Sequence, residues 1–196
     1  MDVVIFGAGG YSREVADVVV AAGYTIAAFQ DDFAEGPHIP TGLPVIRIPD
    51  SSICKQAVCA IGDVQARANC WHSWVKELEF ITLIHPSACV SRYSAIGAGS
   101  QVMQNVVVNA QARVGVNVIL NVGCVVAHDV SVGAHTHIAP GVLLSGASTV
   151  GTRTLVGAGA VLLPGIHVGS DCVIGAGAVV TRNIPDNSKV FGVPAR

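Results

Sequence analysis

Residues 114–150 read VGVNVILNVGCVVAHDVSVGAHTHIAPGVLLSGASTV, and an isoleucine, valine or leucine returns in this stretch at every sixth position. The series extends in both directions without a gap, from Ile84 to Val180, and has seventeen members. An amphipathic helix repeats its apolar residues about every 3.6 positions and a half-buried strand every second one, so neither produces this period. The stretch therefore predicts a repeat architecture.

Each six-residue unit is expected to form a short strand and a turn, with three units closing one coil. The aliphatic side chains then point inward and stack on their equivalents in the next coil, about 4.8 Å away. Glycine follows the aliphatic residue in seven of the seventeen units, and we expect it to permit the turn backbone. A small or β-branched residue four places after each aliphatic, such as Ala88 or Ser100, lets the walls approach. The repeat thus predicts a triangular β-solenoid of between five and six coils.

Residues 1–83 follow a different pattern. The expected elements are strands at 3–6, 24–30 and 58–61, a helix capped by Ser12 that reaches Ala22, and a second helix that follows Gly62 and ends at Glu79. A proline-rich loop separates the second and third strands. The predicted fold class is therefore α/β plus β-solenoid, with a small Rossmann-like βαβ unit at 1–83, a parallel β-helix at 84–184 and a tail at 185–196.

The turn Gly7-Ala-Gly-Gly-Tyr-Ser12 follows a strand and opens a helix, so its backbone amides are placed to hold a phosphate. Asp31 lies near the position from which an acidic residue meets a ribose hydroxyl. NAD is one candidate ligand, and a tight turn without any ligand is the alternative. Ser12 replaces the third glycine of the dinucleotide motif and no second nucleotide-binding half follows. The pattern favours a single nucleotide, one that carries a sugar.

Composition excludes several classes of partner. Charged residues make up 12% of the 196 residues, the formal net charge is −2, and there is no long basic run, which disfavours nucleic acid and anionic lipid. The longest uncharged stretch, 130–152, is interrupted by histidines, a proline and glycines, so no membrane span is expected. The start of the chain lacks the basic region of a signal peptide, and the six cysteines show no metal-like spacing. We expect a cytoplasmic protein whose cysteines are small buried hydrophobic residues.

One solenoid turn carries a candidate catalytic pair, His128 followed directly by Asp129. A carboxylate beside an imidazole holds it in one tautomer and raises its basicity, as a general base requires. Gly146 comes eighteen residues later, one coil on, so it should stack over His128 and offer an N–H to a developing oxyanion. An exposed surface histidine is the alternative interpretation, and we prefer it for His167.

The hexad run, the string around His128-Asp129, the following GAHTHIAP segment that ends at Pro140 and the closing GVPAR resemble the left-handed β-helix acyltransferases. The glycine turn and Asp31-Asp32 narrow the resemblance to sugar acetyltransferases that join a small nucleotide-binding domain to this helix, the PglD-like and NeuD-like enzymes. The resemblance covers essentially the whole chain. It implies left-handedness, acetyl-CoA as co-substrate, no metal, and a homotrimer with its active site between subunits.

The resemblance also implies roles for individual residues. The catalytic base falls on His128 and its supporting carboxylate on Asp129, where PglD-like enzymes often have glutamate. The acetyl-CoA contacts fall on four positions, His137, Gly146, Ala158 and Ala176. The nucleotide-sugar contacts fall on six, Gly9, Gly10, Tyr11, Asp31, Asp32 and Gly62, with Tyr11 in place of a histidine of the PglD-like pattern.

The function expected is acetyl transfer to the amine of a nucleotide-linked amino sugar, directly and with a histidine general base. O-acetylation of sialic acid or another sugar is the alternative. A γ-class carbonic-anhydrase-like zinc enzyme is disfavoured, because His128, His135, His137 and His167 lack the required spacing. A nucleotide-binding scaffold without catalytic activity, and an NAD oxidoreductase, are the remaining interpretations. Cys124 falls on an inward small site, so a nucleophilic role is not expected.

Overall fold

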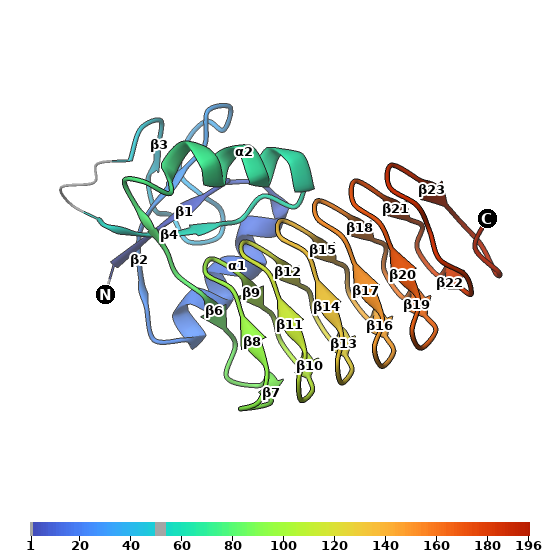
Figure 1. Cartoon of the computed structure of the whole chain (residues 1–196). Coiled ribbons are helices and arrows are strands. Elements are labelled where there is room, and N and C mark those ends of the chain that lie inside the picture. The colour runs from blue at the N-terminus through green and yellow to red at the C-terminus, as the bar shows by residue number, and fades with distance from the viewer. Residues whose placement is uncertain (1, 50–53) are drawn as a thin grey trace.

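The computed structural model describes residues 2–49 and 54–196, which form an N-terminal α/β unit followed by a long parallel β-helix (Figure 1). The N-terminal unit has a fully parallel sheet in the order β3-β2-β1-β4-β5. Its elements are β1 (Asp2–Phe6), α1 (Gly10–Ala21), β2 (Thr25–Gln30), β3 (Val45–Ile46), β4 (Gln56–Cys59), α2 (Val64–Trp74) and β5 (Glu79–Phe80). The predicted Rossmann-like unit is confirmed.

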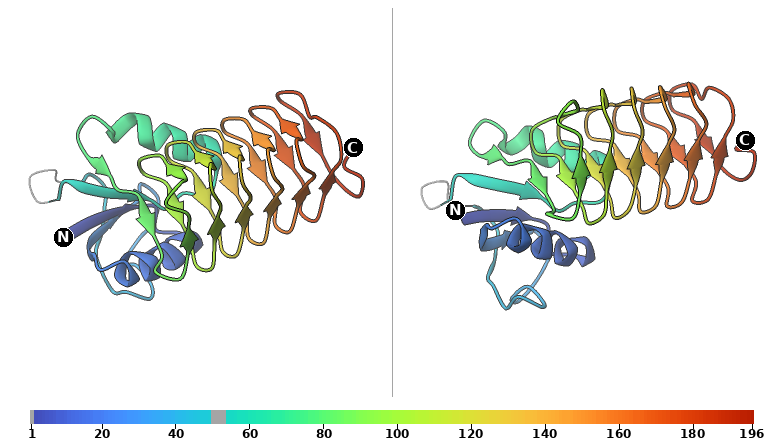
Figure 2. Two further views of the ribbon diagram at one scale, coloured as in Figure 1. Left: turned by 60° about the horizontal axis from the view of Figure 1, so that its bottom comes forward. Right: turned by 90° about the horizontal axis from the view of Figure 1, so that it is seen from below.

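The two helices cover opposite faces of this sheet (Figure 2). Side chains alternate across a strand, so Val3 and Ile5 of β1 join the core that holds Val15 of α1. The intervening Val4 and Phe6 join a separate cluster that contains Trp71 of α2. A single five-residue strand, apolar on both faces, therefore anchors both helices.

Several predicted details of this unit are wrong. The third strand lies at 56–59 rather than 58–61, and α2 ends at Trp74, five residues before Glu79. Helix α1 begins at Gly10, with Gly9 as its N-cap and no side-chain cap. Ser12 is therefore not the cap: it lies inside the first turn, fully buried, and its hydroxyl donates a hydrogen bond to the Gly9 carbonyl at 2.6 Å.

The seventeen predicted repeat strands are all present as two-residue strands, β6 to β22, and β23 adds one more. They form three parallel sheets of seven, six and five strands, which we call walls 1, 2 and 3. Wall 1 consists of β6 (Leu83–Ile84), β9 (Gln101–Val102), β12 (Ile119–Leu120), β15 (His137–Ile138), β18 (Leu155–Val156), β21 (Val173–Ile174) and β23 (Lys189–Val190). Wall 2 consists of β7 (Cys89–Val90), β10 (Val107–Val108), β13 (Val125–Val126), β16 (Leu143–Leu144), β19 (Val161–Leu162) and β22 (Val179–Val180). Wall 3 consists of β8 (Ala95–Ile96), β11 (Arg113–Val114), β14 (Ser131–Val132), β17 (Thr149–Val150) and β20 (His167–Val168).

The repeated aliphatic residues fill the solenoid interior. From Val102 to Val180 each of them is at most 5% exposed, because an equivalent residue stacks above and below it. Ile84, in the first coil, is 39% exposed. Strands pair with a step of one coil, as in Val107 with Val125, so the register predicted from the period of six is confirmed.

The role predicted for the glycine after each aliphatic residue is wrong. The left-handed backbone falls two places later, at residues such as Gly123 (φ 65°), Asp129 (φ 59°) and His135 (φ 61°). The glycine itself is needed because the coils approach closely: a Cβ on Gly133 would lie 2.6 Å from the backbone of Gly151 in the next coil. Close coil-to-coil packing, rather than turn conformation, explains this glycine.

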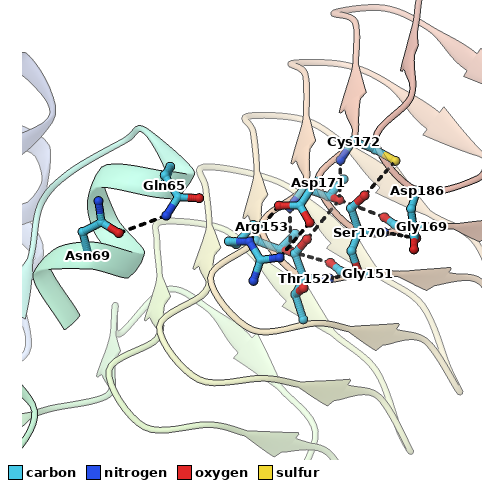
Figure 3. Close-up of polar contacts among 12 residues, drawn as sticks. Gln65, Asn69, Gly151, Thr152, Arg153, Gly169, Ser170, Asp171, Cys172 and Asp186 are labelled. Atoms are coloured by element: carbon cyan, nitrogen blue, oxygen red, sulfur yellow. Dashed lines mark hydrogen bonds and ion pairs between the residues drawn. The ribbon is translucent and has the colours of Figure 1, made fainter. Parts of the chain in front are cut away.

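At the corner between walls 3 and 1, side chains from successive coils stack in a column, Gly99, Asn117, His135, Arg153 and Asp171. Helix α2 covers the first three, and the Trp71 ring lies against Gly99. Beyond the helix, Arg153 and Asp171 form a bidentate ion pair with two contacts of 2.7 Å (Figure 3). The backbone repeat is the same along this column, whereas the type of side chain differs between the part that α2 covers and the part that it does not.

The structure also tests the predictions about membrane spans and about the cysteines. None of the helices in the described residues is long and apolar enough to cross a membrane, and 130–152 consists of solenoid turns and short strands. All six cysteines are free, but only four are buried: Cys89 is exposed and Cys70 half-buried, so the expected burial is wrong for these two. Burial raises the pKa of Cys124 to about 12, which keeps its thiol protonated.

Candidate active site

His128 lies in an exposed turn between β13 of wall 2 and β14 of wall 3. Its Nδ1 lies 2.7 Å from Oδ2 of Asp129, and the two side chains are 68% and 58% exposed. The left-handed backbone of Asp129 turns its carboxylate back toward the preceding imidazole. Since a carboxylate accepts hydrogen bonds, the contact favours the tautomer with a proton on Nδ1 and a lone pair on Nε2.

Gly146 stacks against His128, as the period of six predicted. A Cβ on this residue would lie 2.7 Å from both Nε2 and Cε1 of His128, so only glycine leaves the ring in place. The coils are joined at this point by a hydrogen bond from the Ala147 N–H to the His128 carbonyl, at 3.0 Å. Within the described residues the Gly146 N–H donates no hydrogen bond. An exposed imidazole and a residue whose N–H has no acceptor among the described residues therefore lie next to each other.

His137 of wall 1 has a different environment. Its Nδ1 lies 3.0 Å from the Gly62 carbonyl, and the Asn121 side-chain nitrogen lies 3.3 Å from its Nε2. Burial and the nearby Arg67 charge lower the pKa of His137 to about 4, against the opposite effect of the Gly62 carbonyl. With both ring nitrogens engaged, His137 is a neutral residue that connects the solenoid to the N-terminal unit.

Tyr11 belongs to the same region. Its hydroxyl donates to Oε1 of Gln101 at 3.0 Å, and its ring centroid lies 6.4 Å from that of His137. Gln101 in turn donates from Nε2 to the Cys59 carbonyl at 2.7 Å. Burial raises the pKa of Tyr11 far above its ordinary value, so the phenol stays protonated.

Arg67 of α2 holds the two parts of the chain together. It is fully buried, and its guanidinium partners in the described residues are all backbone carbonyls. They are Ile61 (3.0 Å), Gly62 (3.1 Å) and Asp63 (3.5 Å) from the N-terminal unit, and Asn117 (3.2 Å), His135 (2.6 Å) and Thr136 (3.1 Å) from the solenoid. We call Tyr11, Gly62, Arg67, Gln101 and His137 the interdomain cluster. It positions the loop after β4 relative to wall 1.

The glycine turn after β1 is braced by Asp31. The Asp31 carboxylate accepts hydrogen bonds from the N–H groups of Ala8 (2.8 Å), Phe33 (2.9 Å) and Ala34 (3.0 Å). Burial would raise the pKa of Asp31, but these three hydrogen bonds and the Arg47 charge outweigh it and lower the pKa. The neighbouring Asp32 is exposed and accepts a hydrogen bond from Gln30 at 2.9 Å.

A hollow opens beside this turn, at the carboxyl ends of the parallel strands, where ligands bind in open α/β sheets. Its lining includes Asp32, Phe33, Arg47, Asn69 and Trp74. Gly9 and Gly10 at the start of α1 are exposed, and no neighbouring atom lies within 4 Å of a Cβ built on either. Within the described residues the N–H groups of Gly9 and Gly10 donate no hydrogen bond, and the hollow adds a carboxylate and aromatic rings.

Ala158 and Ala176 lie in exposed turns between walls 1 and 2. They stack on successive coils, since the Gly177 N–H donates to the Ala158 carbonyl at 2.8 Å. His128 lies at a different corner of the triangle, between walls 2 and 3. One chain therefore brings His128, Asp129 and Gly146 together and brings Tyr11, Gly62 and His137 together, while Ala158 and Ala176 lie at another corner than His128.

Sequence reasoning missed Arg67 and Gln101, which belong to the interdomain cluster, and Asn121, which contacts it. Asn121 lies in the segment that carried the resemblance, but its contact with His137 depends on two adjacent coils. An arginine in a short helix carries no sequence signal of burial. Within the described residues no group of three or more histidine, cysteine or acidic side chains is arranged to hold a metal ion.

The fold and the His128 turn define a class of protein: an acyltransferase built on hexapeptide repeats. Residues 2–74 match the PglD N-terminal domain, and residues 149–182 match the hexapeptide repeat of succinyl-transferase. The chain belongs to the PglD- and NeuD-like family of left-handed β-helix sugar acetyltransferases.

Two solved structures illustrate the relationship. PerB from Caulobacter crescentus, in complex with CoA and GDP-perosamine, is 34% identical with a TM-score of 0.94, and the alignment covers 100% of this chain and 96% of PerB. The acetyltransferase domain of PglB from Neisseria gonorrhoeae FA1090 is 34% identical with a TM-score of 0.93, covering 100% and 98% of the two chains. WeeI from Acinetobacter baumannii AYE, 24% identical with a TM-score of 0.89, shares the fold.

Proposed function

We propose that this protein transfers the acetyl group of acetyl-CoA to the amine of a nucleotide-linked amino sugar. The observation that carries the proposal is the His128–Asp129 pair stacked on Gly146, on a chain whose N-terminal unit presents a glycine turn and an open hollow. The similarity to PerB, which was solved with CoA and GDP-perosamine, supports both substrate classes.

The chemistry proposed for His128 is general base catalysis. Nε2 takes a proton from the sugar amine as the amine nitrogen attacks the thioester carbonyl carbon, and a tetrahedral oxyanion forms. Asp129 holds the Nδ1–H and stabilises the imidazolium. The carbon–sulfur bond then breaks, CoA leaves as the thiolate, and the imidazolium returns the proton to sulfur. The products are the N-acetyl sugar and free CoA.

Gly146 fits the role of oxyanion donor. Its N–H donates no hydrogen bond within the described residues, and a Cβ built on it would lie 2.7 Å from Nε2 of His128. A backbone donor fixed where charge develops lowers the barrier without reorganisation, typically by about 3 kcal/mol. No covalent enzyme intermediate is needed, and the buried, protonated Cys124 is not suited to form one.

We further propose that the active site is completed by a second copy of the chain in a homotrimer. His128 lies at the corner of walls 2 and 3, whereas the N-terminal unit packs on wall 1 and Ala158 and Ala176 lie at the corner of walls 1 and 2. A CoA molecule that contacts Ala158 and delivers its thioester to His128 needs these corners from different chains. Light scattering should give the mass of a trimer, and a monomeric mass would contradict this.

Complementation between two inactive variants tests the shared site directly. His128→Asn removes the base, while Gly10→Asp places a carboxylate where a phosphate is expected, at a position with open space for the side chain. Co-expressed subunits should form mixed trimers that recover a fraction of the wild-type activity, since some interfaces combine two intact halves. Equal inactivity of the mixture would place the whole site within one chain.

The substrate itself is tested by CoA thiol release from acetyl-CoA with a panel of UDP-, GDP- and dTDP-linked amino sugars. Turnover of at least one is expected, with loss of turnover in His128→Asn. Turnover of free sialic acid and none of the panel would replace N-acetylation with O-acetylation.

A further inference from the structure

A polar trio, two of whose members are buried while Thr41 is exposed, lies next to the glycine turn and takes no part in the chemistry described above. It consists of Ser12 in α1 and of His38 and Thr41 in the loop between β2 and β3, and Ser12 and His38 are 0% and 3% exposed. The Ser12 Oγ lies 2.9 Å from Nε2 of His38, and Nδ1 of His38 lies 3.0 Å from Oγ1 of Thr41. The His38 ring is stacked on Phe29 of β2, with centroids 3.6 Å apart.

The Gly9 carbonyl at one end of this trio and the Leu43 N–H at the other fix which group donates in each hydrogen bond. The Ser12 hydroxyl donates to the Gly9 carbonyl, which can only accept, so its oxygen accepts from Nε2–H of His38. Nδ1 of His38 then accepts from the Thr41 hydroxyl, whose oxygen accepts from the Leu43 N–H at 3.3 Å. Burial, together with the Arg13 charge, lowers the pKa of His38, which keeps the ring neutral as this arrangement requires.

Ser12 connects the trio to the Gly9–Gly10 peptide. The Gly9 carbonyl is held inward by the Ser12 hydroxyl at 2.6 Å and by the Ser12 N–H at 3.2 Å. In a planar trans peptide the N–H points opposite to the carbonyl, so the Gly10 N–H faces outward, to the exposed side of the turn. Two successive glycines leave the backbone free to adopt many conformations, so they do not by themselves fix the orientation of this peptide. The constraint therefore comes from the two hydrogen bonds that the Gly9 carbonyl accepts, and the shorter of them is from the Ser12 side chain.

We propose that Ser12 and His38 are positioning residues, which hold the Gly10 N–H in the direction needed to bind a phosphate of the nucleotide. The inference rests on the proposed function, because it concerns the same nucleotide site. It also explains why this chain has Ser12 where the dinucleotide motif has its third glycine: the hydroxyl occupies the space and bonds the turn. The loop at 38–43 thereby controls nucleotide binding although it contributes no ligand.

The experiment measures nucleoside diphosphate binding by calorimetry in the full-length protein, with GDP, UDP and dTDP as probes. Whichever diphosphate binds to wild type, Ser12→Ala and His38→Leu should each lower its affinity about tenfold. This is the usual effect of losing one hydrogen bond to a charged group. His38→Gln retains a donor and an acceptor and should stay close to wild type. Ser148→Ala is the matched control, a serine that is also fully buried but far from the turn, and it should bind like wild type.

Kinetics separate positioning from general loss of structure. KM for the nucleotide sugar should rise in Ser12→Ala, while KM for acetyl-CoA and kcat stay at wild-type values. Unchanged diphosphate affinity in both Ser12→Ala and His38→Leu overturns the proposal, as does an equal loss in His38→Gln and His38→Leu.

The proposed function can fail separately. Wild type that binds a diphosphate, with weaker binding in Ser12→Ala but no acetyl transfer to any sugar, supports the positioning role and contradicts the function. Wild type that binds none of the three diphosphates contradicts both.

Discussion

The two histidines of the middle coils, His128 and His137, share one scaffold but differ in exposure and in hydrogen bonding. His128 lies in a turn that is open to solvent; Asp129 holds one ring nitrogen, and the other has no hydrogen-bond partner among residues 2–49 and 54–196. His137 lies against the N-terminal unit, with both nitrogens engaged and its pKa lowered to about 4. The same repeat thus places two histidines in different surroundings, one exposed in a turn and one against the N-terminal unit, and the difference lies in what covers each wall.

The largest expected effect comes from His128→Asn. Loss of the general base should lower kcat by about a thousandfold, within the range usual for positioned acid–base groups. Because the side chain is 68% exposed, thermal denaturation should give the Tm of wild type. Thiol-release kinetics and calorimetry on the same preparation measure both quantities, and activity near the wild-type level would remove His128 from the mechanism.

Arg67→Met tests the contact between the N-terminal unit and wall 1, where His137 lies. The substitution leaves buried carbonyls of both parts of the chain without a donor, so the free energy of unfolding should fall by about 3 kcal/mol. Chemical denaturation measures this loss. The exposed Arg92 is the matched control, and Arg92→Met should unfold like wild type. An unchanged midpoint in Arg67→Met would mean that the interdomain cluster does not stabilise the chain.

His137 should make stability depend on pH. Its pKa is about 4 in the folded chain, against 6.5 for an unperturbed histidine such as that of the unfolded chain. Above pH 6.5 the ring is neutral in both states. As the pH falls toward 4, the unfolded chain takes up a proton before the folded chain does, so stability is lost in this window. The loss due to this one group is about 2 kcal/mol at pH 5.

Denaturation midpoints measured between pH 8 and about 4.5, with His137→Asn as the comparison, isolate this contribution. Asparagine retains a donor for the Gly62 carbonyl and does not titrate, so its curve should be flatter. His135, whose pKa burial also lowers to about 4, contributes equally to both proteins. Parallel curves would show that His137 accepts a proton in the folded state.

The smallest effect is expected from Gly146→Ala. The added Cβ lies 2.7 Å from the His128 ring and moves it, and because the ring is exposed it can move without unfolding the coil. We expect kcat to fall about tenfold from the displaced base. Gly123→Ala is a steric control away from the site, because a Cβ there meets no atom within 4 Å and Asp129 carries a side chain at a similar φ. Equal activity in wild type and Gly146→Ala would mean that His128 works from another rotamer.

The amino-acid order alone was enough to predict the solenoid, its register, the contact between His128 and Gly146 and the pairing of His128 with Asp129. The first three could be predicted because, in a repeat, residues that are neighbours in space are a fixed number of positions apart in the chain. Asp129 directly follows His128 in the sequence. The roles of Ser12 and of the glycine after each aliphatic residue were predicted wrongly, because turn propensity is local while close packing between coils is not.

The folded chain was needed to show that the half-buried His137 contacts the N-terminal unit, that Arg67 joins two parts of the chain, and that Ser12 contacts His38. These contacts join segments that share no period, so nothing in their spacing shows that they touch. Burial and pKa follow from that contact, since the same imidazole in an exposed turn would keep a free nitrogen. The repeat therefore reveals which histidine neighbours Asp129 and Gly146, whereas the packing of the N-terminal unit on wall 1 decides that His137 is covered and His128 stays exposed.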